Sequence, residues 1–292
     1  MTYTVMCASN YHYGSDDDSY RAGKFETFEE ARAKCRLIVQ RCHDEAFRPG
    51  MTAEDLYATY KAFGEDPYIV PRPKGKRFSA WKYAEKLAGQ MCDARLGRRY
   101  DAALKFAAEL HRDQVRKGSN VPYLSHLLAV SGLVMEYGGY EDQAIAALLH
   151  DAIEDQSEKA GGADALRKII LDRFGDTVLC IVEACTDSDT EPKPPWKKRK
   201  EAYLAHLTSA QVPPYAFLVS SCDKLHNVRS IVSDFRKHGD ALFKRFTGGK
   251  KGTLWYYRAL VDVYRGIKYP TAVEELDLAV TEMERLAGRA GA

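Results

Sequence analysis

The stretch that most constrains this chain is AIAALLHDAIED at residues 144–155, an apolar run that ends in four groups able to bind metal or carry protons. The run predicts a buried helix. If that helix continues, Glu154 lies one turn beyond His150 and Asp155 lies one turn beyond Asp151. An unpaired carboxylate in an apolar interior is costly, so a bound cation is the simplest compensation. An ordinary helix end with solvated acidic residues is the alternative.

Two further stretches carry candidate metal ligands. PYLSH at residues 122–126 places His126 before an apolar run, and SSCDKLHNVR at residues 220–229 puts Asp223 and Asn227 four residues apart, on one face of a helix. Two imidazoles and two carboxylates from three separated helices would form a mixed nitrogen and oxygen set. Such a set suits manganese, iron or zinc better than calcium, and the spacing alone leaves that choice open.

The order His126, His150-Asp151, Asp223 resembles the metal signature of the HD-domain phosphohydrolases. Five sequence words narrow the resemblance to the hydrolase domain of the RelA/SpoT proteins and the small alarmone hydrolases: QVRK at 114–117, PYLSH at 122–126, ALLHDAIED at 147–155, FG at 174–175 and DKLHNVR at 223–229. The likeness spans residues 98–268. Where that family usually has proline after its first ligand histidine, this chain has Leu127, which changes the local turn and leaves the ligand in place.

The resemblance implies a role for each of these residues. One manganese ion per chain would be held by His126, His150, Asp151 and Asp223. Glu154 and Asp155 would act on the water nucleophile and the leaving group, a role that fits general acid–base chemistry. The nucleotide would be contacted by Arg116, Lys117 and Asn227, two cations and an amide that suit a polyphosphate.

The implied reaction is removal of the 3′-pyrophosphate from guanosine tetra- or pentaphosphate. Related HD enzymes act on other nucleotides, so hydrolysis of an adenosine alarmone, NADPH or a dNTP is the alternative within the enzymes. A nucleotide-sensing binding module is the alternative from another class. A sensor is freer to lose Glu154 or Asp155, so the presence of both favours turnover.

Domain organisation changes near residue 97. Before it, we expect strands near 2–8, 23–27 and 67–71, a helix at 28–46 whose capping box uses Thr27 and Glu30, and a helix starting near Ser79. Residues 1–97 are therefore predicted to form a small α+β domain, which resembles a small bacterial module of unknown role. Residues 98–292 read almost entirely as helix and are predicted to form an all-helical HD-type domain, which makes the chain mainly α. A last helix at 271–287 leaves no room for a synthetase domain.

Composition sets the remaining bounds. Of 292 residues, 45% are hydrophobic and 29% charged, which is typical of a soluble globular protein. The net charge of +2 predicts no nucleic-acid partner. Seven cysteines without a CxxC pair argue against a disulfide framework or a zinc ribbon, and the chain shows neither a signal peptide nor a membrane-spanning apolar run. We expect a cytoplasmic protein with a small nucleotide substrate; oligomer formation and a protein partner for the first domain stay open.

Three features near the proposed site have two interpretations. The basic cluster of Lys193 and residues 197–200 forms either a solvated loop edge or a means of attracting pyrophosphate. His111 either touches the ligand or packs in the core. His226, three residues beyond Asp223, is expected to orient that carboxylate.

Overall fold

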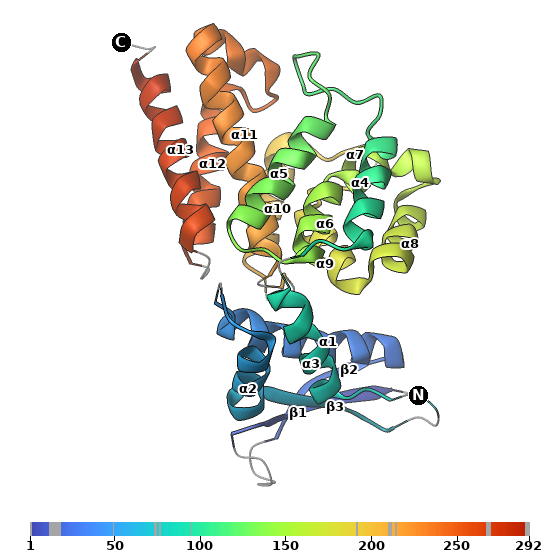
Figure 1. Ribbon diagram of the computed structural model, residues 1–292. Coiled ribbons are helices and arrows are strands. Elements are labelled where there is room, and N and C mark those ends of the chain that lie inside the picture. The colour runs from blue at the N-terminus through green and yellow to red at the C-terminus, as the bar shows by residue number, and fades with distance from the viewer. Residues whose placement is uncertain are drawn as a thin grey trace. The chain divides into compact units, whose positions relative to one another are not determined.

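The chain forms two compact units, Met1–Arg95 (unit 1) and Leu96–Ala292 (unit 2), drawn in Figure 1. This computed structural model describes residues 2–11, 19–48, 50–72, 75, 77–93, 95–190, 192–209, 212–213, 215–266 and 270–289. The mainly helical fold expected from the sequence is confirmed, with one small sheet in unit 1. Within the described ranges, no helix is both long and apolar enough to cross a membrane.

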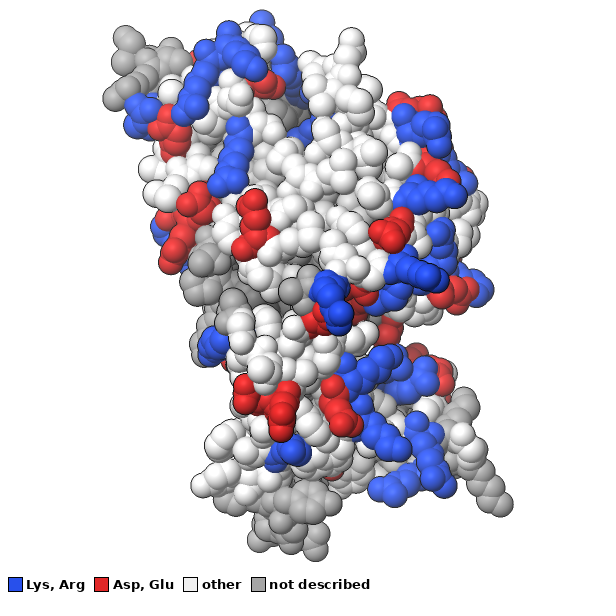
Figure 2. Space-filling model, in the orientation of Figure 1, with Lys and Arg blue, Asp and Glu red and all other residues white. Residues whose placement is uncertain are grey.

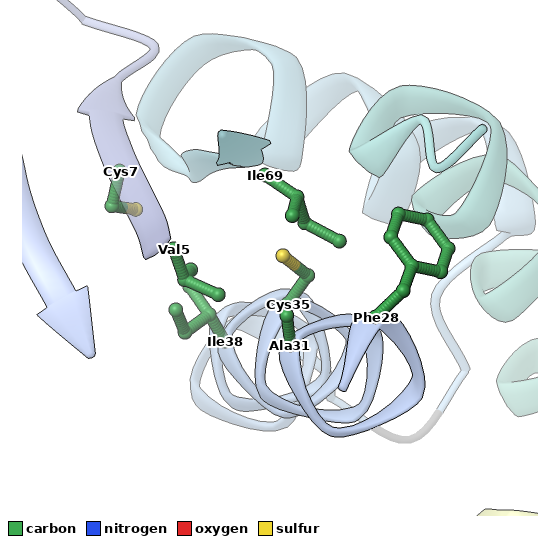
Figure 3. Packing of buried hydrophobic residues seen from close by; sticks show 7 residues of the cluster. All are labelled: Val5, Cys7, Phe28, Ala31, Cys35, Ile38 and Ile69. Atoms are coloured by element: carbon green, nitrogen blue, oxygen red, sulfur yellow. The ribbon is translucent and has the colours of Figure 1, made fainter. Parts of the chain in front are cut away.

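Unit 1 combines a three-stranded antiparallel sheet, in the order β2-β1-β3, with helices. Its elements are β1 (Tyr3–Ser9), β2 (Tyr20–Phe25), α1 (Phe28–Ala46), α2 (Ala53–Phe63), β3 (Glu65–Val70) and α3 (Ala80–Cys92). Alternate side chains of β1 point toward α1, so that Val5 and Cys7 pack with Cys35 and Ile38 in the buried cluster of Figure 3. This cluster holds α1 against the sheet.

Helix α1 has the bounds and the capping box that the sequence predicts. Oγ1 of Thr27 accepts a hydrogen bond from the amide of Glu30 at 3.2 Å, and Oε2 of Glu30 accepts one from the amide of Thr27 at 3.0 Å. Two amides at the helix N-terminus, which lack partners inside the helix, are thereby satisfied.

Unit 2 is helical. Its α-helices are α4 (Arg98–Leu110), α5 (Leu124–Glu136), α6 (Glu141–Leu149), α7 (Ala152–Gln156), α8 (Ala163–Phe174), α9 (Asp176–Cys185), α10 (Trp196–Leu207), α11 (Ala216–His238), α12 (Gly249–Arg265) and α13 (Pro270–Arg289); η2 (Ser157–Ala160) and η3 (Gly239–Arg245) are 3₁₀ helices. Helix α6 packs against α4, α5, α9 and α11. Because neighbours cover it on several sides, residues 142–150 are all buried, which explains an apolar run without a polar face.

The expectation of one continuous helix through residues 144–155 is wrong. Helix α6 ends at Leu149, His150 and Asp151 form the junction, and α7 begins at Ala152. Consecutive side chains in a regular helix point about 100° apart. The junction brings Nε2 of His150 to 2.9 Å from Oδ2 of Asp151. Asp155 remains one turn beyond Asp151, since its amide donates to the Asp151 carbonyl at 3.0 Å.

Candidate metal centre

Four predicted ligands meet in the interior of unit 2. His126 lies in α5, His150 and Asp151 at the junction of α6 and α7, and Asp223 in α11. The ligand atoms of His126, His150 and Asp223 lie within 4.8 Å of one another, and all three residues are buried. Oδ2 of Asp151 is 3.7 Å from Nε2 of His126, so the fourth residue borders the same point.

Both histidines turn Nε2 toward this point. Nε2 of His126 lies 3.1 Å from Oδ1 of Asp223, and Nε2 of His150 lies 2.9 Å from Oδ2 of Asp151. Among the described residues, neither of these buried nitrogens makes a hydrogen bond of regular geometry. Nδ1 of His150 is 2.8 Å from the carbonyl of Ala147 and must donate to it, because a carbonyl only accepts. In the neutral ring Nε2 then carries the lone pair, as a metal ligand requires. These residues can therefore hold a divalent ion.

The electrostatics of the pocket also favour a cation. Burial alone would lower the pKa of His150, but the carboxylates of Asp151 and Asp223 raise it well above its usual range. Burial would raise the pKa of Asp151, yet the charge of His150 keeps it well below the ordinary value. Both carboxylates are therefore ionised, and a divalent ion would offset their charge in place of the proton that His150 otherwise holds.

His226 does not orient Asp223, so that expectation is corrected. Its Nδ1 lies 2.8 Å from Nδ1 of His126, and the two rings are 4.8 Å apart between centroids. Burial and the neighbouring His126 lower the pKa of His226 to about 4. Because α5 and α11 lie side by side, the side chain of His226 reaches the partner helix instead of its own.

Asp223 is held by two residues that follow it in α11. Nζ of Lys224 donates to Oδ2 at 2.5 Å, and Nδ2 of Asn227 donates to Oδ1 at 2.6 Å. Burial would raise the pKa of Asp223, but Lys224 and His150 keep it well below the usual range. The carboxylate is therefore ionised and fixed in orientation.

Tyr123 is a site residue that the sequence analysis did not identify. Its hydroxyl donates to Oδ2 of Asp151 at 2.5 Å. Its ring stacks on His111, with centroids 5.4 Å apart and an interplanar angle of 13°. His111 is thus packed in the core behind Tyr123, and its Nδ1 donates to Oε1 of Gln114. The word PYLSH contained the signal, because its tyrosine precedes the first ligand by one turn.

Glu154 lies among basic side chains. Its Oε1 is 3.2 Å from Nζ of Lys193 and 3.4 Å from Nη1 of Arg199. Arg199 and Lys200 also bind Oδ2 of Asp187, at 2.6 and 2.7 Å. The basic cluster therefore divides in two, since these three cations face carboxylates near the site, whereas Lys197 and Lys198 are exposed.

Asp155 points to a different partner. Oδ2 of Asp155 accepts a hydrogen bond from Nε2 of Gln114 at 2.8 Å. Burial, followed by the negative charge of Asp151, raises the pKa of Asp155 to about 6. A carboxyl group with such a pKa gains and loses protons near neutral pH.

Arg116 and Asn227, two of the residues expected to contact a nucleotide, lie beside the predicted ligand Asp223. Nη2 of Arg116 donates to Oδ1 of Asn227 at 2.7 Å, and its guanidinium lies over the ring of Tyr123 at 5.6 Å. Arg116 belongs to a turn closed by pairing between Val115 and Pro122. Lys117 follows in this turn with an exposed side chain.

Comparison with known proteins places this unit in a family. The HD domain family matches residues 103–254. The chain is 37% identical over 132 residues to the guanosine-3′,5′-bis(diphosphate) 3′-pyrophosphohydrolase MESH1 of Xenopus tropicalis, a match that covers 44% of this chain and 67% of that protein. It is 32% identical over 136 residues to the probable guanosine-3′,5′-bis(diphosphate) 3′-pyrophosphohydrolase of Synechocystis, covering 44% of this chain and 16% of that protein.

A solved structure gives the same result for the fold. This structure, described as a metazoan ortholog of SpoT that hydrolyses ppGpp, matches with a TM-score of 0.51 and 24% sequence identity. The match covers 66% of this chain and 98% of that one. At this identity the likeness concerns the fold alone. Since the family match spans the helices that carry His126, His150, Asp151 and Asp223, the chain belongs to the HD domain family.

Proposed function

We propose that unit 2 is a manganese-dependent hydrolase that removes the 3′-pyrophosphate from guanosine tetra- or pentaphosphate. The observation that carries the proposal is the convergence of His126, His150 and Asp223, three buried residues whose ligand atoms lie within 4.8 Å of one another, with Asp151 beside them. Membership of the HD domain family and the names of the relatives support a metal-dependent phosphohydrolase. The chain spans about two thirds of the Xenopus relative and a small part of the Synechocystis one, so the substrate belongs to the proposal.

The ligand set proposed for the metal is His126, His150, Asp151 and Asp223. When bound, the ion would lower the pKa of a coordinated water and offset the charge of a phosphate group. The chain fixes the donors in advance: Tyr123 holds Asp151, and Lys224 with Asn227 holds Asp223. Preorganised ligands of this kind keep the site from rearranging when the ion enters.

Glu154 and Asp155 are proposed to move protons. Asp155 has a pKa of about 6 and so exchanges a proton readily near neutral pH. Glu154 lies in the same short helix, and Lys193 and Arg199 hold its side chain in place. A purely sensing pocket needs neither group, so their position beside the ligands favours turnover over binding alone.

The proposed substrate contacts are Arg116, Lys117 and Asn227. Arg116 and Asn227 already meet through a hydrogen bond, which places a guanidinium and an amide together beside Asp223. Lys117 is exposed in the adjoining turn and available to a phosphate group. These groups recognise phosphate and leave the base open, so other nucleotides are the alternative substrates.

The direct test is turnover by the purified full chain with manganese and a panel of nucleotides. The panel contains guanosine tetraphosphate, an adenosine alarmone, NADPH and deoxynucleotides, with products resolved by ion exchange. We expect pyrophosphate and guanosine 5′-diphosphate from the tetraphosphate. If the protein hydrolysed NADPH or deoxynucleotides but not guanosine tetraphosphate, the metal assignment would stand and the proposed substrate would be refuted.

Lys117→Ala separates substrate binding from general damage. Because Lys117 is exposed, its loss should weaken hydrolysis of guanosine tetraphosphate by about tenfold or more and leave a small phosphate ester unaffected, since only the large substrate uses remote binding energy. Asn227→Ala is less clean, because Asn227 also orients Asp223. Equal losses on both substrates for Lys117→Ala would contradict its role, and Lys168→Ala, exposed on α8, is the control.

A further inference from the structure

Unit 1 contains a groove of about 1140 Å³ that is independent of the metal centre. Its described lining comes from α1, β3, residues 72, 75 and 77–79, and the first turn of α3. Its described lining contains five cationic side chains, Arg32, Arg36, Arg72, Arg77 and Lys82. It also contains five aromatic ones, Phe28, Tyr68, Phe78, Trp81 and Tyr83. Nothing in the chemistry proposed for unit 2 uses these residues.

The charge of the groove favours an anion. Among its described lining residues, Asp66 is the one carboxylate, and one of its oxygens accepts a hydrogen bond from Nε1 of Trp81 at 3.0 Å. Arg72, Arg77 and Lys82 are exposed and thus open to a ligand. Figure 2 shows Lys and Arg gathering at the lower right of unit 1, whereas both signs are mixed over the visible face of unit 2.

The first turn of α3 adds to this field. Helices α1 and α2 begin with acidic residues, which complement the positive end of a helix dipole. The first turn of α3 carries Lys82 and no acidic residue. Backbone amides at a helix N-terminus attract phosphate, and here they open into a groove that is already basic.

The aromatic residues suit a flat ring. Tyr68, Phe78, Trp81 and Tyr83 are all partly buried. The rings of Phe78 and Tyr83 are 6.1 Å apart, and the guanidinium of Arg36 lies 5.5 Å from the ring centre of Tyr83. Aromatic faces beside arginines are the surfaces on which nucleic-acid bases stack.

We propose that the groove of unit 1 binds a free nucleotide, with its base against the aromatic rings and its phosphates against Arg72, Arg77 and the first turn of α3. The volume of about 1140 Å³ lies slightly above the range of small-ligand sites, about 300–1,000 Å³, and so leaves room for a mononucleotide. The net charge of +2 agrees, because binding of a nucleic-acid strand usually depends on an extended basic surface. This site neither requires nor contributes to hydrolysis in unit 2.

Hydrogen exchange measured by mass spectrometry locates the bound ligand and does not depend on enzymatic activity. The full chain is incubated with ADP, GDP, inorganic pyrophosphate or an octanucleotide of RNA. A nucleoside diphosphate should slow exchange in peptides covering 66–72 and 77–83. Pyrophosphate should slow exchange in the same peptides at least tenfold less, because it lacks a base that could stack on the aromatic rings. Absence of protection by either nucleoside diphosphate would overturn the proposal.

The other two ligands decide what kind of site this is. Equal protection by pyrophosphate would show that the groove is an anion site. Tighter binding of the RNA would show that it is a strand-binding surface. Either result would overturn the proposal of a nucleotide site. Changes confined to peptides of unit 2 would report only the proposed active site and would likewise refute a site in unit 1.

Charge reversal at two exposed positions tests the residues. Arg72→Glu combined with Arg77→Glu should weaken nucleoside diphosphate binding in unit 1 by at least about tenfold. Arg21→Glu reverses an exposed arginine on β2, outside the groove, and should leave the affinity unchanged. Trp81→Phe should abolish the change in tryptophan fluorescence that the nucleotide produces in unit 1. Equal affinity in the double variant and in Arg21→Glu would refute the assignment.

Discussion

The polar side chains around the metal centre fall into two groups, according to whether their atoms already take part in hydrogen bonds. Both oxygens of Asp223 accept hydrogen bonds, from Asn227 and Lys224, and Oδ2 of Asp151 accepts one from Tyr123. Nε2 of His126 and of His150 makes no hydrogen bond of regular geometry among the described residues, although each lies close to a carboxylate oxygen. The two nitrogens and the two carboxylates together form the candidate metal site.

Asp151→Ala should remove the metal and the activity together. The change deletes a carboxylate that borders Nε2 of both histidines, and a lost ligand loosens such a site. We expect metal content, measured by mass spectrometry of the purified protein, to fall from about one ion per chain to near zero. Asp172→Ala, on an exposed aspartate of α8, should retain the ion. Full occupancy in Asp151→Ala would show that this carboxylate is no ligand.

Glu154→Gln should separate chemistry from binding. Glutamine keeps the shape of the side chain and can still accept from Lys193 and Arg199, but it cannot exchange a proton as a carboxylate does. We expect kcat to fall about a hundredfold or more, with metal content and nucleotide affinity retained. Glu183→Gln on α9, where Arg167 binds at 3.1 Å, is the matched control. If Glu154→Gln turned over close to the wild-type rate, Glu154 would not be the proton-transfer group and the role would fall to Asp155.

Within single elements, the predicted ligands lie where a helix changes from buried to partly exposed. Residues 216–223 of α11 are buried without interruption, and the helix becomes partly exposed from Lys224 onward. Asp223 therefore lies at the end of the apolar half, where a carboxylate is close to both the core and the polar residues that hold it. His150 and Asp151 likewise lie at the end of a buried helix, at the junction of α6 and α7.

At this scale the capping box of α1 can be tested. Thr27→Ala removes the hydroxyl that accepts from the amide of Glu30, so the helix loses a satisfied N-terminus. The free energy of unfolding of unit 1 should decrease by about 1 kcal/mol, measured by urea denaturation. Thr27→Ser retains the hydroxyl and should restore most of the loss. A serine variant as unstable as the alanine variant would attribute the effect to the methyl group.

The whole molecule consists of two compact units, of which one contains the proposed metal. Ligands that bind only the folded state stabilise it by mass action. Chelation with EDTA should therefore lower the unfolding temperature of unit 2 and leave that of unit 1 unchanged. At a metal concentration about 100 times the Kd, the lost stabilisation is about 2.7 kcal/mol.

Calorimetry of the full chain with and without manganese measures this effect, and hydrogen exchange assigns each transition to its unit. Asp151→Ala should behave like the chelated protein in both conditions, because it lacks the site that the ion stabilises. A shift of equal size in both units would contradict a metal confined to unit 2.

Much of the candidate site could be predicted from local sequence. The bounds and cap of α1 follow from periodicity and from Thr27 and Glu30, which act within a few residues. The words around His126, His150 and Asp223 carry a family resemblance, and each predicted ligand lies beside an apolar run that becomes a buried helix. Such patterns depend on short-range geometry, which a sequence expresses directly.

The remaining features depend on contacts between distant residues. His226 meets His126 across 100 positions of sequence, and Arg116 meets Asn227 across 111. Whether Glu154 faces water or Lys193 and Arg199 depends on where the chain before α10 returns, which periodicity does not encode. The sequence by itself determined which side chains are candidates to bind a metal and carry protons. Only tertiary packing decided which of their atoms converge on one point, because contacts between distant residues depend on position in space.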